Sequence, residues 1–162
     1  MSSASQPGVT TYDTPNDLEI VAVRTVNAPR ALVFDAYTNP KHLPNWMTGP
    51  AGWAMPVCEV DLRPGGATRY VYRNETGGEM IVTGQFHEVT PPERIVSTES
   101  WGAGWPESWN TLEFAEAGGR TTITMTVKYA SKEIRDAAYK SGMKEGMAAS
   151  FARLDSLLET LR

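Results

Sequence analysis

Polar and apolar residues alternate along several segments of the chain, and this period of two residues predicts β-strands with one buried face. The clearest case is the segment 120–129, where Ile123, Met125 and Val127 alternate with threonines. Proline- and glycine-rich turn sequences, such as residues 61–66, separate the segments and indicate that neighbouring strands run antiparallel. Seven strands are predicted, over residues 18–26, 57–62, 68–73, 79–89, 94–101, 108–115 and 120–129.

Elsewhere the apolar spacing changes to three and four residues, which predicts helices. Two short helices, over residues 30–37 and 41–47, follow the first strand, and Pro29 stands where a proline favours a helix start. Residues 131–162 carry apolar side chains at helical intervals to the end of the chain. Gly142 could divide this long helix, because glycine inside a helix costs about 1 kcal/mol relative to alanine. One helix and two helices both remain open.

These elements predict an α+β fold in which a curved, seven-stranded antiparallel sheet wraps around a long C-terminal helix. We expect a cavity between sheet and helix, because the two surfaces cannot touch everywhere along a curved sheet. Residues 1–16 are polar and rich in turn formers, so a flexible tail is expected there, and residues 17–162 should form a single domain.

Composition excludes several classes of protein. With 41% hydrophobic and 21% charged residues, the chain resembles an ordinary soluble domain. Its net charge of −4 offers no basic surface for nucleic acid. Cys58 is a single cysteine, and neither a secretory signal nor an apolar run of membrane-spanning length is present, so we expect a cytoplasmic protein without a membrane anchor.

Aromatic and methionine side chains are the candidates for lining the predicted cavity, since they offer large apolar surfaces to a ligand. Trp101 and Trp105 lie in a glycine-rich loop that suits a lid. Core packing is the alternative for Trp46, Trp109 and the methionines, and the two tyrosine hydroxyls could instead reach solvent. The candidate ligand-binding residues are Trp46, Trp53, Tyr70, Tyr72, Met80, Phe86, Trp101, Trp105, Trp109, Met125, Met143, Met147 and Phe151.

Catalytic and metal-binding patterns are sparse. His42 and His87 stand without a second ligand at metal spacing, so we expect no metal and no cofactor. Cys58 fits an inert position on a strand face. Weak acid/base candidates are Glu99, Tyr70 and Tyr72, because a carboxyl group in an apolar cavity has a raised pKa. Whether Glu99 and Glu88 point inward or into solvent is open.

Five short motifs occur in a particular order along one domain: Trp46 with Gly49-Pro50, residues 61–66, residues 91–94, Gly119-Arg120-Thr121, and Gly142-Met143 with Gly146. The chain thereby resembles the Activator of Hsp90 ATPase homologue 1-like family, within the START and Bet v 1-like helix-grip superfamily, which includes polyketide cyclases. This resemblance implies the helix-grip fold and a binding cavity. Relatives often carry Gly-Trp in the last helix where this chain has Gly146-Met147.

Three functions are compatible with these observations. The first is binding of a small hydrophobic or aromatic molecule without catalysis, which we prefer because no catalytic set is recognisable. A cyclase or hydrolase resembling the polyketide cyclases is the second, and a chaperone-interacting or stress-response module is the third. A chain of 162 residues leaves no room for the N-terminal domain of the eukaryotic co-chaperone, which argues against Hsp90 activation. A homodimer is compatible with the sequence, and the oligomeric state stays open.

Overall fold

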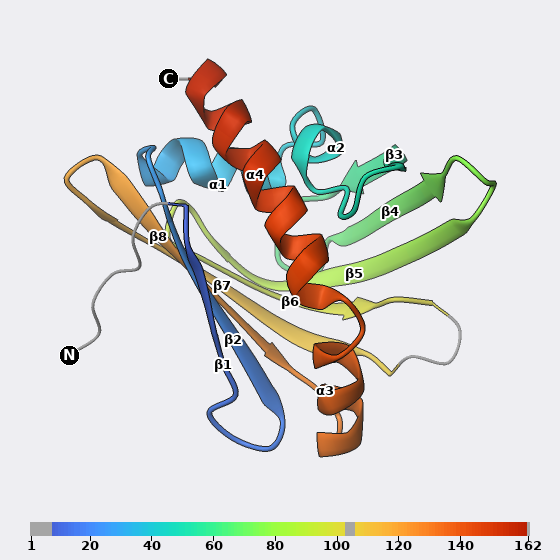
Figure 1. Ribbon diagram of the computed structural model, residues 1–162. Helices are drawn as coiled ribbons and strands as arrows, with labels where there is room; N and C mark the ends of the chain where they lie inside the picture. Colours follow the sequence, from blue (N-terminus) through green and yellow to red (C-terminus); the bar gives the residue numbers. More distant parts are fainter. Residues whose placement is uncertain (1–7, 103–105, 162) are drawn as a thin grey trace.

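The computed structural model describes residues 8–102 and 106–161, and Figure 1 shows their arrangement. One antiparallel sheet contains every strand of the described residues, in the spatial order β1-β2-β8-β7-β6-β5-β4-β3. Its strands are β1 (Thr10–Asp13), β2 (Glu19–Val26), β3 (Trp53–Val60), β4 (Ala67–Asn74), β5 (Glu79–Thr90), β6 (Arg94–Ser100), β7 (Ser108–Ala117) and β8 (Arg120–Lys128). The helices are α1 (Arg30–Thr38), α2 (Leu43–Trp46), α3 (Lys132–Tyr139) and α4 (Met143–Leu161).

The described sheet has eight strands where seven were predicted. The additional strand is β1, which lies within the segment expected to be a loose tail and pairs with β2 from Thr10 opposite Arg24 to Asp13 opposite Val21. Threonine and tyrosine favour strands, and the ring of Tyr12 also lies 5.2 Å from the Lys144 ammonium group, so even this short polar segment is held. The rest of the predicted tail, residues 1–7, lies outside the described residues.

The C-terminal segment forms two helices, α3 and α4. Gly142 separates them with a φ of +88°, a conformation that other residues rarely adopt. The Ser131 hydroxyl accepts a hydrogen bond from the backbone N–H of Ile134 at 3.2 Å and so caps the start of α3. The chain therefore turns at Gly142 before α4 runs across one face of the sheet (Figure 1).

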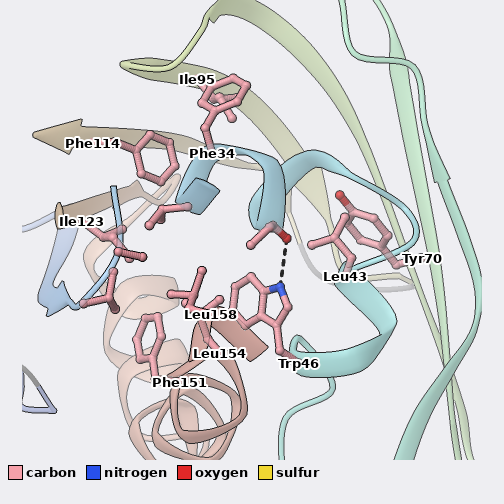
Figure 2. Packing of buried hydrophobic residues seen from close by; sticks show 14 of the residues in the cluster. Phe34, Leu43, Trp46, Tyr70, Ile95, Phe114, Ile123, Phe151, Leu154 and Leu158 are labelled. Atoms are coloured by element: carbon pink, nitrogen blue, oxygen red, sulfur yellow. Dashed lines mark hydrogen bonds between the residues drawn. The ribbon is translucent and has the colours of Figure 1, made fainter. Parts of the chain in front are cut away.

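The core lies between this face of the sheet and the helices α1, α2 and α4. Phe34 of α1 packs edge-on against Phe114 of β7, with ring centroids 5.7 Å apart, while Leu154 and Leu158 of α4 are fully enclosed (Figure 2). Helix α1 contacts β7 and β8 directly, whereas α4 packs mainly on α1 and α2. Helix α1 therefore approaches the sheet more closely than α4 does.

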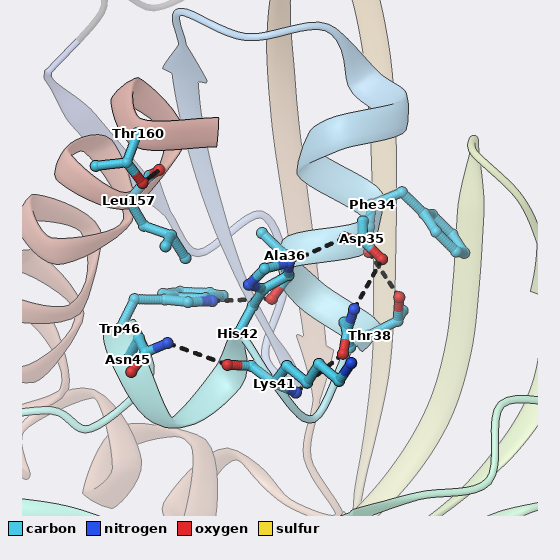
Figure 3. A network of polar contacts seen from close by, with 11 residues as sticks. Phe34, Asp35, Ala36, Thr38, Lys41, His42, Asn45, Trp46, Leu157 and Thr160 are labelled. Carbon is cyan, nitrogen blue, oxygen red and sulfur yellow. Dashed lines mark hydrogen bonds and ion pairs between the residues drawn. The ribbon is translucent and has the colours of Figure 1, made fainter. Parts of the chain in front are cut away.

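Short polar contacts fix the turn between α1 and α2 (Figure 3). The Thr38 hydroxyl donates to the Phe34 carbonyl at 2.8 Å, and Asp35 lies 3.1 Å from Nε2 of His42. The indole N–H of Trp46 donates to the Ala36 carbonyl at 2.9 Å. The Trp46 bond gives the Ala36 carbonyl, near the end of α1, a partner that the helix itself does not supply.

A partly buried ion pair joins the sheet to α4. Arg24 projects from β2 into the interior, where its Nη2 lies 2.6 Å from Oδ2 of Asp155 and its Nη1 donates to the Thr10 hydroxyl at 2.9 Å. The guanidinium group also lies 4.9 Å from the centre of the Phe151 ring. Because the Arg24 side chain is only 7% exposed, its charge depends on Asp155 for compensation.

We expect Asp155→Asn to lower the free energy of unfolding by about 2 to 3 kcal/mol, because the buried Arg24 charge would lose its partner. Urea unfolding at pH 7 measures this. Glu79→Gln is the matched control, since Glu79 pairs with Arg73 at 2.8 Å on the exposed face and should contribute less than about 1 kcal/mol. Equal losses in the two variants would contradict a special role for the Arg24 pair.

Candidate functional site

The inner face of the sheet changes from apolar to polar along its strands. In β6 the residues on this face are Ile95, then Ser97, then Glu99, and Ile95 belongs to the core. In β7 the same face runs from the buried Phe114 through Leu112 and Asn110 to Ser108. The end of the sheet away from α1 therefore presents polar groups toward the interior.

Glu99 stands in the middle of a row of small polar residues across four strands. The register places Thr68 of β4 opposite Gly84 of β5, Gly84 opposite Glu99, and Glu99 opposite Ser108 of β7. Because residues directly opposite one another share a face of the sheet, all these positions point to the same side as Ile95. The question of where Glu99 points is thereby answered: it lies on the inner face.

Gly84 leaves the space beside Glu99. A Cβ atom on Gly84 would lie 2.6 Å from the Thr68 hydroxyl oxygen and 2.8 Å from the Thr98 carbonyl oxygen, closer than such atoms approach. A glycine inside a strand often marks a bulge or bend, but the register shift in β5 lies between Phe86 and Glu88. At Gly84 the pairing is regular, and the glycine serves close packing instead.

The environment of Glu99 makes ionisation unfavourable. Its carboxyl group is partly buried, and loss of solvation raises its pKa to about 7. A hydrogen bond from the Trp101 indole acts in the opposite direction and favours the carboxylate. Within the described part of the chain, no lysine, arginine or histidine forms an ion pair with Glu99. A carboxyl group with this pKa is partly ionised at neutral pH.

Three tyrosines lie near this carboxyl group, and Cys58 lies opposite one of them, Tyr70, in the sheet. Tyr70 and Tyr72 of β4 are each 7% exposed, and burial together with the nearby Glu99 charge raises the pKa of both hydroxyls. Burial, with a smaller effect of Glu99, raises the pKa of Tyr129 to about 12. Burial and Glu59 raise the pKa of Cys58 to about 11, so the thiol is unreactive as expected. All four groups are neutral near pH 7.

Trp101 lies at the edge of this cluster. Its indole stacks nearly parallel on the Tyr72 ring, with an interplanar angle of 8° and centroids 6.4 Å apart, and 44% of the residue remains exposed. One exposed aromatic surface next to a buried carboxyl group is a suitable rim for a binding site. Trp105, the second tryptophan predicted for this loop, lies outside the described residues.

We call Glu99, Tyr70, Tyr72, Tyr129 and Trp101 the Glu99 cluster. The sequence pointed to four of its members and missed Tyr129. The sequence pattern could have identified Tyr129, because this residue continues the inward alternation of Ile123, Met125 and Val127. Two surface pockets beside α4, one bordered by Asn27 and Glu159 and one by Asn45 and Arg153, contain no member of the cluster. The site is thus identified by its side-chain chemistry.

Most other predicted lining residues also lie on the interior side. Trp53, Met80 and Met147 are partly buried and pack on the core, Met125 and Met143 are partly buried, and Phe86 and Phe151 are 6% exposed. Phe151 lies under Arg24, and nothing places it beside Glu99. These residues make the interior apolar around the polar end of the sheet.

Two predicted ligand-binding tryptophans lie elsewhere. Trp46 is 2% exposed and its N–H is used by Ala36, so it fills the core, which was the alternative interpretation. Trp109 lies on the outer face, opposite Thr98, where it is 45% exposed and stacks on His87 at 4.6 Å. Its position follows from the alternation in β7, since the buried Phe114 is five residues away and therefore on the other face.

The remaining charged candidates have surface partners. Glu88 pairs with Arg94 at 3.3 Å. On the outer face of β4, Arg69 pairs with Glu59 at 3.7 Å and Arg73 pairs with Glu79 at 2.8 Å. His42 is engaged by Asp35. Among the residues that the structure describes, no group of three or more His, Cys, Asp or Glu side chains could hold a metal ion.

An antiparallel sheet curved around a C-terminal helix, with two short helices after an early strand, defines the helix-grip class of α+β proteins. The sequence model of the Activator of Hsp90 ATPase homolog 1-like family matches residues 27–159, and the chain belongs to this family. No helix in the described ranges is long and apolar enough to cross a membrane.

Solved structures agree with this assignment. A Rhodobacter sphaeroides protein is similar with a TM-score of 0.89 and 28% identity, over 93% of this chain and 98% of that one. A Nitrosomonas europaea protein has a TM-score of 0.81 and 26% identity, over 91% and 97% of the two chains. An AHSA1-like protein from Aeromonas hydrophila shares the fold, with a TM-score of 0.71 and 19% identity, over 86% of this chain and 94% of that one. No curated protein matches the chain.

The raised pKa of Glu99 predicts how stability depends on pH. The folded protein binds more protons than the unfolded chain between the two pKa values, about 4.5 and about 7, so the contribution of Glu99 to stability is complete below pH 4.5 and is lost as the pH rises through 7. Glu99→Gln cannot ionise and should therefore be more stable than the wild type at pH 8, by about 1 to 3 kcal/mol.

Chemical denaturation at pH 5 and pH 8 measures this difference, which should be several-fold smaller at the lower pH. Glu88→Gln is the control, because Glu88 lies near the surface with Arg94 and its replacement should give no gain at pH 8. A Glu99→Gln variant that is less stable than the wild type at pH 8 would mean that the carboxylate is well solvated.

Proposed function

We propose that this protein binds a small hydrophobic or aromatic ligand at the Glu99 cluster, between the polar end of the sheet and the helices. The observation that carries the proposal is Glu99 itself, a partly buried carboxyl group on the inner face without a cationic partner among the described residues. Keeping such a group there costs stability, whereas Arg24, another charged residue on this face, has a partner. A ligand that contacts the carboxyl group would offset the cost.

The aromatic surroundings support an apolar or aromatic ligand body. Tyr72 and Trp101 already stack, so a further ring or alkyl chain would extend an existing flat surface. Met80 and Met147 are partly buried nearby in the core layer and have flexible side chains that adapt to different shapes. Family membership agrees with this role but names no ligand.

Trp101 and Trp109 offer a direct test, because they are equally exposed, at 44% and 45%, on different parts of the sheet. A thermal-shift screen of hydrophobic and aromatic compounds should give ligands whose stabilisation falls at least several-fold in Trp101→Ala. The same compounds should stabilise Trp109→Ala as they stabilise the wild type. Native mass spectrometry of the purified protein checks the stoichiometry.

Equal losses in the two tryptophan variants would move the site away from the Glu99 cluster. The absence of any stabilising compound, together with the absence of a co-purifying molecule, would count against ligand binding altogether.

The pKa of Glu99, about 7, favours a second candidate function, general acid or base catalysis. In that case the tyrosine hydroxyls, which are neutral near pH 7, would donate hydrogen bonds to a developing negative charge. The chemistry would be a cyclisation or hydrolysis of an aromatic or polyketide-like substrate. Turnover of aromatic esters that falls about 100-fold or more in Glu99→Gln, with folding intact, would support this candidate, and unchanged turnover would exclude Glu99 from it.

A further inference from the structure

The Glu99 cluster has a definite electrostatic character. It contains one ionisable carboxyl group, three tyrosine rings and an indole, and the neighbouring positions in its row are Thr68 and Ser108. Oxygen atoms dominate its polar surface, and the faces of aromatic rings carry partial negative charge. When Glu99 is ionised, such a surface attracts positive charge and repels an anion.

The cations on the interior side, and the exposed Lys144, are engaged by other partners. Arg24 pairs with Asp155, and Arg135 donates to the backbone carbonyls of Asn16 and Glu19 at 2.6 and 3.3 Å and to Asp136 at 2.8 Å. Lys144 lies over two tyrosine rings, 4.5 Å from that of Tyr139. Each of these groups therefore already has its counter-charge or acceptors, and none of them acts on the pKa of Glu99.

We infer that the ligand of the Glu99 cluster is an amphiphilic cation: an aromatic or alkyl body that carries a protonated amine or a quaternary ammonium group. The cationic group lies against Glu99 and the ring faces of Tyr70 and Tyr72, and the apolar body extends along Trp101. This inference rests on the proposed function and narrows it to a class of ligand.

Two interactions add up at this place. An ammonium group close to a carboxylate in a partly dehydrated site gains more Coulomb energy than it would in water. Aromatic faces contribute a further cation–π attraction, which grows as the cation is desolvated. Fatty acids and other carboxylates gain neither, because their charge has the wrong sign.

Binding of such a cation is coupled to the proton of Glu99. The other titratable groups that face it are Tyr70 and Tyr72 of β4 and Tyr129 after β8, while Cys58 of β3 lies opposite Tyr70, and burial keeps all of them neutral below pH 8. The neighbouring β5 and β7 contribute Gly84 and Ser108, which do not titrate. Changes in affinity between pH 6 and pH 8 therefore report the Glu99 carboxyl group.

Benzyltrimethylammonium and its uncharged isostere neopentylbenzene form a matched pair of probes, since only the charge differs. Binding is followed by protein NMR, with the indole N–H signal of Trp101 as a local reporter because this group hydrogen-bonds to Glu99. The cation should bind more tightly than the isostere at pH 8. With a pKa of about 7, its affinity should be roughly tenfold higher at pH 8 than at pH 6.

Two variants separate charge from shape. Glu99→Gln should abolish both the preference for the cation and its pH dependence, while leaving the binding of neopentylbenzene nearly unchanged. Trp101→Ala should weaken both probes, and Trp109→Ala, on the outer face, should weaken neither.

The outcomes distinguish this inference from the proposed function. Equal binding of both probes at the Trp101 signal would overturn the cationic class and leave ligand binding intact. Tighter binding of 4-tert-butylbenzoate, an anion of similar size, would reverse the inferred sign of the ligand charge. Failure of all three probes to perturb the cluster would overturn the inference and would count against the proposed function as well.

Discussion

Incomplete coverage of the curved sheet is the constraint on which the rest of the structure depends. Helix α1 packs directly on β7 and β8, where Phe34 meets Phe114, and this contact makes one end of the inner face a dry core. Helix α4 packs chiefly on α1 and α2 and reaches the sheet through long side chains such as Phe151, whose ring lies under Arg24 of β2. The helices therefore pack less closely on the polar end of the sheet. There the inner face can carry Glu99 and Ser108 instead of apolar residues.

Charge on the inner face is handled in two different ways. Arg24 is balanced by Asp155 and holds α4 in place, so its burial contributes to the architecture. Glu99 has only a neutral donor, the Trp101 indole, and its pKa moves to about 7 as a result. A group that contributed only to folding would be better replaced by an uncharged residue. The contrast between the two residues is the reason for placing the proposed site at Glu99.

Much of the fold follows from local patterns in the sequence. The alternation in residues 120–129 and the turn at residues 61–66 correctly placed β8 and the pair of β3 and β4, and Gly142 marked the break between α3 and α4. Strand β1 was missed, because it depends on pairing with β2, and the local pattern of four mostly polar residues does not predict that pairing.

The site was less predictable for a related reason. Tyr70 and Tyr72 could be assigned to the inner face because β4 alternates clearly, but β6 is too mixed for the alternation to orient Glu99. Only the register, which sets Glu99 between Gly84 and Ser108, decides its direction. For Trp109 the prediction was wrong, because the aromatic residue type suggested a ligand contact. The alternation of side chains in β7 places Trp109 on the outer face of the sheet.

A carboxyl group surrounded by groups that stay neutral has a charge that its ligand can set. The tyrosine hydroxyls and the Cys58 thiol keep their protons near pH 7, so the Glu99 proton is the one that can be gained or lost there among these groups. A neutral ligand leaves the carboxyl group free to donate a hydrogen bond, and a cation removes its proton and pairs with the resulting charge. Binding and proton transfer are thus two uses of the same physical property, and what separates them is whether the bound molecule has a bond at which that proton can act.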